Sequence, residues 1–227
     1  MPSRQKTGMF VSAFFTCVCS FVMICVVLAT QHWMSSRIRF SGTNSSVTVS
    51  LTYGLFSGTC EQLFEAGLQV SEENFQVAEH LTSTTVKSMN IAIIVLMVLS
   101  LLSSLLSCGF TCTNAVSNPY QTFLGPIGVY TWNTLCGILA FIAMVLFPVN
   151  VEVNSLSVEL ARVCSSLLQT HTDSTHMYGY SYWIMLLIIF LNICSIIIIY
   201  FYDHARYSKK KEQERPIENA PKDVILF

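Results

Sequence analysis

Few side chains of this sequence could carry out chemistry, and the first candidates are His171, Asp173 and His176. Imidazole and carboxylate groups of these types bind zinc. Their spacing, in a Thr- and Ser-rich loop, matches no established zinc-ligand motif, so we expect no metal site there. We also expect no other cofactor, no catalytic residue and no nucleic-acid partner.

Two cysteines, Cys60 and Cys164, could form a disulfide. The sequence holds nine cysteines, and the others lie in apolar segments or at their ends, whereas these two lie in polar segments. Disulfides persist in oxidising compartments, so the bond requires that both polar segments face the outside of the cell. Two unpaired thiols are the alternative, because a sequence does not show the geometry that a disulfide needs.

Three other residues are candidates for covalent modification. Cys108 and Cys112 lie near the end of an apolar segment, where S-palmitoylation commonly occurs, although buried or free thiols fit the pattern as well. Asn44 is the first residue of an Asn-Ser-Ser sequon, which is an N-glycosylation acceptor if it lies outside the cell.

The chain ends in Ile225, Leu226 and Phe227. Apolar side chains at the last position and two positions before it suit a peptide that adds to the edge strand of a PDZ domain. The C-terminus is therefore a candidate PDZ ligand.

Four apolar segments must position these residues, and their lengths suit membrane crossings. Residues 88–151 include no Asp, Glu, Lys, Arg or His, a stretch long enough for two crossings of roughly 20 residues each. Only 11% of the chain is charged and 52% is apolar, which argues against a soluble globular domain. The first segment could instead be a signal peptide, but its apolar core exceeds the usual length of about 7–15 residues. We predict spans at residues 9–29, 91–110, 127–147 and 183–202.

The polar residues inside the predicted spans are uncharged. Intramembrane acidic or basic groups mark catalytic and proton pathways, so we expect no enzyme. Asn133 and Asn192 are expected to form hydrogen bonds between helices. Ser100, Ser104 and Cys108 follow one another at four-residue steps and form a small-residue face, which suits close helix packing either within one chain or between chains.

Basic residues after the last span indicate the orientation. Arg206 and residues 209–211, all Lys, follow it closely, whereas no Lys or Arg occurs in the segment 163–182 before it. Because positive charge stays cytoplasmic, we expect both termini in the cytoplasm and Asn44 outside the cell. We expect the protein to lie in the plasma membrane. The predicted cytoplasmic segments are 1–8, 111–126 and 203–227, and the predicted extracellular segments are 30–90 and 148–182.

The extracellular segments predict a small β module. Residues 38–53 alternate between apolar and polar on either side of a polar turn at 41–46, which is typical of a β-hairpin. The residues from Ser71 onward read as helical. Leu156 and Leu160 predict a short amphipathic helix that covers the hairpin. The predicted fold is an all-α membrane protein, a four-transmembrane-helix bundle with a small extracellular β-hairpin or sheet module.

The chain resembles the clarin family at Trp33, in the sequence Tyr-Gly-Leu-Phe at residues 53–56, in the segment 118–126 and at its apolar C-terminus. The resemblance covers all four predicted spans and the tail. It implies a multi-pass membrane protein of sensory and epithelial cells, linked to membrane organisation and to the actin cortex, with no enzymatic activity.

Clarins are in turn similar to the claudin and peripheral-myelin tetraspan group, whose first outer segment carries a Trp, then Gly-Leu-Trp and two cysteines. Trp33, Gly54 and Leu55 match that pattern. Phe56 replaces the second Trp, and Cys60 has no partner within that segment. The resemblance therefore does not imply tight-junction strand formation.

These observations favour a non-enzymatic protein that organises a membrane region and its cortical actin through extracellular and C-terminal contacts. The expected partners are the lipid bilayer, a PDZ-domain scaffold, and other tetraspan proteins in homo- or hetero-oligomers. The alternative is a pore-forming or auxiliary channel subunit with a claudin-like ion pathway, in which Arg37 and Arg39 would lie near the pore mouth.

Overall fold

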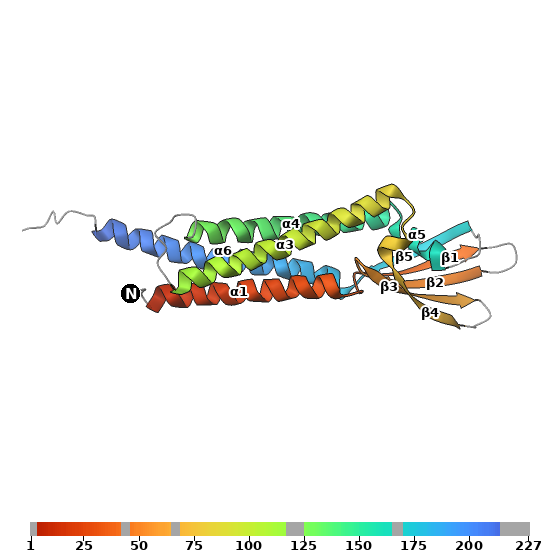
Figure 1. The fold of residues 1–227 in the computed structure, drawn as a ribbon, viewed down its shortest axis with the longest axis horizontal. Helices are drawn as coiled ribbons and strands as arrows, with labels where there is room; N and C mark the ends of the chain where they lie inside the picture. Colours follow the sequence, from red (N-terminus) through yellow and green to blue (C-terminus); the bar gives the residue numbers. More distant parts are fainter. Residues whose placement is uncertain (1–3, 42–45, 65–68, 117–124, 165–169, 214–227) are drawn as a thin grey trace, which may run out of the picture.

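Four long helices form a bundle, and a five-stranded sheet lies at one end of it (Figure 1). The computed structural model describes residues 4–41, 46–64, 69–116, 125–164 and 170–213. Each long helix is long and apolar enough to cross a membrane, and each contains one predicted span. The four are α1 (Arg4–Ala29), α3 (Thr84–Val116), α4 (Pro126–Glu152) and α6 (Tyr180–Gln213).

Local sequence explains where α4 begins, and the lengths of α3 and α6 show that these two helices extend beyond the membrane core. Helix α4 begins with Gly125 as its N-cap residue and Pro126 at its first position, where the missing N–H of proline breaks no hydrogen bond. Helices α3 and α6 contain 33 and 34 residues. At about 1.5 Å per residue both exceed the hydrocarbon thickness of roughly 30 Å, so both continue beyond the bilayer core.

The small-residue face of α3 packs inside the chain. Ser100 and Ser104 are buried. The Ser100 hydroxyl donates to the carbonyl oxygen of Cys136 on α4 at 3.2 Å, and the Ser104 hydroxyl donates to that of Cys17 on α1 at 3.5 Å. Small side chains permit such close helix contacts. The face predicted from Ser100, Ser104 and Cys108 therefore joins helices of one chain, with Cys108 only half-buried.

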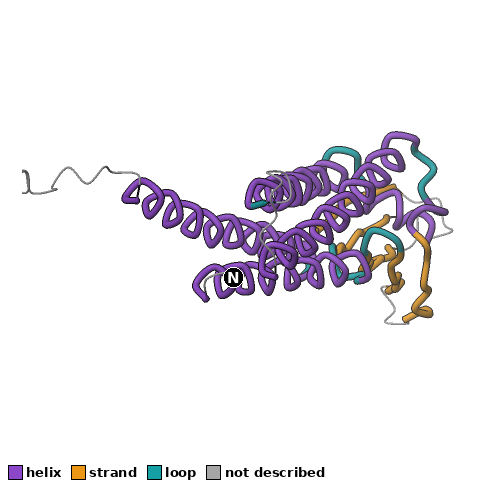
Figure 2. Tube along the Cα trace, turned by 60° about the vertical axis from the view of Figure 1, so that its left-hand side comes forward, coloured by secondary structure: helices purple, strands orange, loops and turns teal. Residues whose placement is uncertain are grey.

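The sheet is entirely antiparallel and has the strand order β4-β3-β2-β1-β5. Figure 2 shows the strands, in orange, gathered at one end of the bundle. The predicted hairpin is present, since β1 pairs with β2 from Met34 opposite Tyr53 to Ser41 opposite Ser46. The strands are β1 (Met34–Ser41), β2 (Ser46–Tyr53), β3 (Ser57–Phe64), β4 (Gln69–Gln76) and β5 (Thr170–Tyr178).

Two expectations about the outer segments are wrong. The residues after Ser71 form strand β4, and only Val77–His80 forms a helix, α2, before α3 begins. Phe75 is buried between two exposed residues, which is the alternation of a strand, and it lies opposite Gly58 of β3. Likewise, His171, Asp173 and His176 lie in strand β5 rather than in a loop. In both cases pairing with the adjacent strand of the sheet overrides the local sequence preference.

The amphipathic helix α5 (Leu156–Cys164) is present as predicted. It lies against β1, β2 and β3, with Leu156, Leu160 and Ala161 buried. The apolar face of α5 thus covers the inner face of the sheet, and the hairpin is part of what it covers. We refer to the five strands, α2 and α5 together as the outer module.

Candidate functional site

Trp33 fixes the outer module to the bundle. Its side chain is fully buried, its indole N–H donates to the carbonyl oxygen of Val27 at 2.8 Å, and its ring centroid lies 4.9 Å from that of Phe147. Its main-chain N–H donates to the Tyr53 carbonyl oxygen, and its carbonyl oxygen accepts from Gly179. A buried indole needs a hydrogen-bond acceptor, and Val27 supplies it. One residue thus joins α1 and α4 to the ends of β2 and β5.

The Gly-Leu-Phe segment between β2 and β3 is a second anchor. A Cβ atom at Gly54 would overlap the main chain of Thr30, so only glycine permits this close approach. Leu55 is buried, and its carbonyl oxygen accepts from the Asn90 side chain of α3 at 3.2 Å. The side chain of Phe56 is 48% exposed. The Trp33 and Gly54-Leu55 pattern therefore has a structural role, in which the side chain of Phe56 takes little part.

A buried chain of hydroxyl groups connects the strands with α5. The Tyr53 hydroxyl lies 2.6 Å from that of Ser157, which lies 3.0 Å from that of Ser36. Ser36 in turn lies 2.9 Å from Nδ1 of His176. Burial raises the pKa of Tyr53 above its usual value, so its hydroxyl stays neutral. These hydrogen-bonded side chains fix α5 to β1, β2 and β5.

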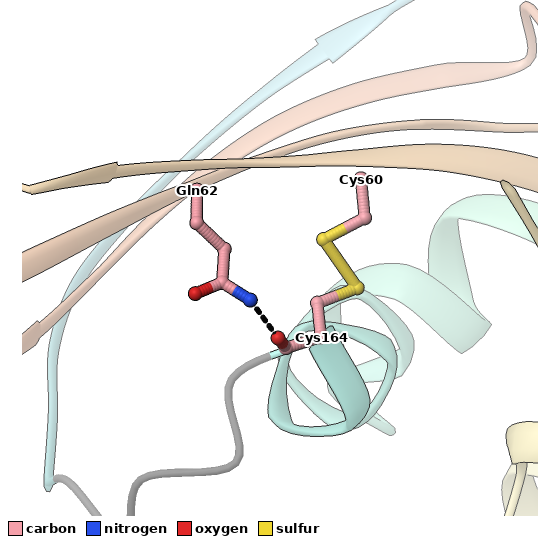
Figure 3. The surroundings of a disulfide bond; sticks show 3 residues. All are labelled: Cys60, Gln62 and Cys164. Atoms are coloured by element: carbon pink, nitrogen blue, oxygen red, sulfur yellow. Dashed lines mark hydrogen bonds between the residues drawn. A yellow bond between two sulfur atoms is a disulfide. The ribbon is translucent and has the colours of Figure 1, made fainter. Parts of the chain in front are cut away.

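The Cα atoms of Cys60 on β3 and Cys164 at the end of α5 are 6.4 Å apart, a separation that a disulfide spans. Figure 3 shows the bond between their sulfur atoms and the side chain of Gln62, whose amide nitrogen donates to the carbonyl oxygen of Cys164. A disulfide here would attach α5 to β3. This attachment lies on the opposite side of β1 and β2 from β5.

Glu159 of α5 binds the segment that leads into α3. Its Oε1 atom accepts hydrogen bonds from the main-chain N–H groups of Thr82 and Ser83, both at 2.6 Å, and from the Thr82 hydroxyl at 2.8 Å. Both residues precede Thr84, the first residue of α3, so the carboxylate fixes the turn into that helix and lies near its positive end. This contact connects the second outer segment to the second span.

The outer face of the sheet, which faces away from α5, is polar. Ser35, Arg37 and Arg39 alternate with buried residues along β1, and all three are exposed. Arg37 lies opposite Ser50 on β2, and Arg39 lies opposite Thr48. Within the part of the chain that the structure describes, no strand pairs with the far edge of β4 or of β5. The outer module thus presents a polar face and two open edges.

The three residues first considered for zinc lie on both faces of β5. Asp173 is paired with Arg39, an outer-face residue, while His176 contacts the buried Ser36 on the inner face. The ring of His171 lies 6.4 Å from that of Phe40. Among the described residues, no three potential ligands of the His, Cys, Asp or Glu types are grouped so that they could hold a metal ion.

A second cluster of polar residues lies at the centre of the bundle, and all four long helices contribute to it. Cys17 Sγ lies 3.3 Å from the hydroxyl of Ser107 and 3.3 Å from that of Ser195. The Asn133 side chain donates to Ser107 at 2.7 Å, and Asn192 donates to Ser20 of α1 at 3.0 Å. The interhelical hydrogen bonds predicted for Asn133 and Asn192 are confirmed.

The sequence alone does not single out Cys17 and Ser195 as members of this cluster. One signal could have found them, since Cys17 and Ser20 are three residues apart and share a face of α1, and Asn192 and Ser195 share a face of α6 in the same way. The helical period therefore places the two members of each pair on the same side of their helix, where they can meet the polar face of α3.

Other predicted sites differ in how far the structure describes them. The side chain of Cys112 is exposed on α3, whereas Cys108 is half-buried. Asn44 and the C-terminal residues Ile225, Leu226 and Phe227 lie outside the described residues.

The fold and the site define a multi-pass integral membrane protein in which a four-helix bundle carries an antiparallel outer sheet. A family model described as Clarin-2-like matches residues 5–199. The chain is 50% identical to Clarin-3 of Mus musculus and 47% identical to Clarin-3 of Homo sapiens, each over 227 residues and the whole of both chains. It is 25% identical to Clarin-2 of Homo sapiens over 194 residues, which are 81% of this chain and 82% of that protein. The chain belongs to the clarin family, which confirms the resemblance seen in its sequence.

Proposed function

We propose that this chain organises a region of the plasma membrane as a non-enzymatic protein, through contacts of its outer module outside the cell and of its C-terminal tail inside. The observation that carries the proposal is the anchoring of the outer module. Trp33, Leu55 and Glu159 attach it to three of the four long helices. A polar surface held in a fixed position relative to the membrane suits recognition of neighbouring proteins better than chemistry.

The surroundings of the buried thiol support the absence of enzymatic activity. Cys17 lies beside Ser107, Ser195 and Asn133, which are neutral groups that cannot act as a general base. A nucleophile needs an adjacent base or a cation to become active. The neutral cluster instead suits hydrogen bonding that fixes how the helices pack.

The proposed orientation places both termini in the cytoplasm. Charge supports it, because the described residues at the bundle end away from the sheet include six basic and two acidic residues. The described residues at the sheet end include four basic and seven acidic residues. Basic segments stay on the cytoplasmic side. In this orientation Asn44, between β1 and β2, faces the outside and carries a glycan, and Cys60 and Cys164 form their bond in an oxidising compartment.

Two contacts at the cytoplasmic side complete the proposal. The C-terminal residues Ile225, Leu226 and Phe227 bind a PDZ-domain scaffold, which links the chain to the actin cortex. Cys108 and Cys112 are the candidate palmitoylation sites, and the exposure of the Cys112 side chain favours that residue.

Proximity labelling from the C-terminus in epithelial cells tests this function. We expect the full chain to label PDZ-containing scaffold and cortical actin proteins, and a variant lacking residues 225–227 to lose them. A second variant, Arg37→Glu with Arg39→Glu, should keep the scaffold but lose neighbours that contact the outer face. If both variants label the same proteins as the full chain, neither surface recruits partners.

A second candidate function is a pore-forming or auxiliary channel subunit. The observation that favours it is the exposure of Arg37 and Arg39 side by side on one polar sheet face, where they could set the charge of an ion pathway. Conductance across an epithelial monolayer separates the two functions. The same charge reversal should change ion selectivity for a channel subunit and leave it unchanged for an organiser.

A further inference from the structure

Helix α6 extends past the packed part of the bundle. The last described residue of α6 that packs with either apolar core is Tyr202, whose ring lies 5.0 Å from that of Phe10 on α1. The helix continues to Gln213, about 16 Å further along its axis. Figure 1 shows this blue end of α6 projecting beyond the other helices. We call residues 203–213 the α6 extension.

Aromatic side chains indicate where the bilayer surface meets this helix. Tyr200, Phe201 and Tyr207 are each at least 58% exposed. The ring of Tyr200 also stacks on that of His204, with centroids 6.1 Å apart. Tyrosines are enriched at the level of the lipid headgroups. The α6 extension therefore begins at the headgroup layer.

The charge of the α6 extension is positive. It carries Arg206 and the three lysines at 209–211 against Asp203 and Glu212. Positions 206, 209 and 210 share one face of a helix by its period. Arg206 lies about 6 Å and Lys211 about 14 Å beyond Tyr202 along the axis. The separation of these basic positions from the headgroups is thus comparable with the Debye length of about 8–10 Å.

The neighbouring helix adds to the same charge. Helix α1 packs against α6 and begins with Arg4 and Lys6 at this end of the bundle. Basic positions of two helices thus lie at the same end of the bundle. A layer of anionic headgroups around the protein complements this arrangement better than one acidic peptide would.

We propose that this basic end of the bundle binds anionic phospholipids of the leaflet that it crosses. Each Lys or Arg near such a surface adds to the attraction, and Asp203 and Glu212 offset part of it. In the cell the proposal takes its orientation from the proposed function, because anionic lipids are concentrated in the cytoplasmic leaflet.

The test uses the full chain in symmetric phosphatidylcholine vesicles, so that its outcome does not depend on orientation. Spin-labelled phosphatidylserine or phosphatidylcholine is added as a probe, and electron spin resonance gives the fraction of each that the protein immobilises. We expect about a threefold preference for phosphatidylserine at low salt, falling toward none near 1 M salt, where the Debye length is about 3 Å.

Two variants with a matched control make the outcome specific. Replacement of Arg206 and of the lysines at 209–211 with Gln should at least halve the preference, and Arg4→Gln with Lys6→Gln should lower it less. Arg37→Gln with Arg39→Gln, at the other end, should leave it unchanged. Thermal unfolding in pure phosphatidylcholine verifies that every variant is folded.

A wild-type chain without preference at low salt, or an α6 variant that keeps the full preference, overturns the proposal. Loss of the preference in the Arg37 and Arg39 control also overturns it, since the outer end would then bind the lipid. None of these results depends on the partners that proximity labelling measures, so the two proposals fail separately.

Discussion

Cys60 and Cys164 allow the strongest test of the outer module, because a disulfide acts as one unit. Cys60→Ser, Cys164→Ser and the double variant should therefore destabilise the protein by the same amount. If the cysteines were unpaired, the two single effects would instead add in the double variant.

The size of the effect follows from the loop that the bond closes. The two cysteines are 104 residues apart, but α3 and α4 lie within that loop and stay inserted when the outer module unfolds. The flexible parts, from Cys60 to Thr84 and from Glu152 to Cys164, amount to about 36 residues, for which the chain-entropy relation gives about 4 kcal/mol. At roughly 2–4 °C per kcal/mol, the melting temperature should fall by about 8–16 °C.

Thiol counting after denaturation measures the bond itself. A maleimide that adds a fixed mass should count two more thiols after reduction than before it, whatever the state of the other seven cysteines. Denaturation before labelling is needed because Cys60 is only 2% exposed and would resist labelling in the folded state. Equal counts with and without reductant, or additive losses of stability, would refute the pairing.

Three further predictions concern single residues. Glu159→Ala removes the hydrogen bonds to Thr82 and Ser83 and should lower stability by about 1–2 kcal/mol, while Glu159→Gln keeps an acceptor oxygen and should recover most of it; equal melting temperatures for wild type and Glu159→Ala would contradict this role. Asn44→Gln should abolish a glycosidase-sensitive shift in gel mobility. A wild-type chain without that shift would mean that the sequon lies in the cytoplasm or is not glycosylated. Phe227→Ala should weaken binding of a peptide of residues 219–227 to its PDZ domain at least about tenfold, because burial of that ring contributes roughly 1.5–3 kcal/mol; no binding to any PDZ domain in an array would exclude the motif.

The parts of the fold that the sequence predicts are those set by local periodicity. The four long helices follow from uncharged apolar runs, and the hairpin of β1 and β2 follows from two-residue alternation on both sides of a polar turn. Helix α5 follows from Leu156 and Leu160, which lie four residues apart on one face. In each case the side-chain pattern and the final burial agree, so no distant contact is needed to explain the element.

Strands β4 and β5 could not be predicted in that way, because pairing with an adjacent strand, and not their own side-chain pattern, stabilises them. Strand β4 pairs with β3, and its residue Phe75 is buried where it lies across from Gly58. Strand β5 has almost no apolar alternation, and its inner-face residue His176 is accommodated by a hydrogen bond to Ser36. A polar strand of this kind becomes recognisable only when the strand beside it is known.

The chain departs from the claudin pattern at Phe56 and at Cys60. The way in which the outer module is anchored explains both departures. The main chain of Phe56 is used, since its carbonyl oxygen accepts from the N–H of Val77 at 2.8 Å, but its side chain points to the surface. A residue in that position can change without loss of the anchor, which depends on Trp33 and Leu55. The Cα atom of Cys60 lies 6.4 Å from that of Cys164 on α5, in the second outer segment. Because α5 also binds the segment before α3 through Glu159, a disulfide there would hold together both outer segments and the second span, which a bond within the first segment could not do.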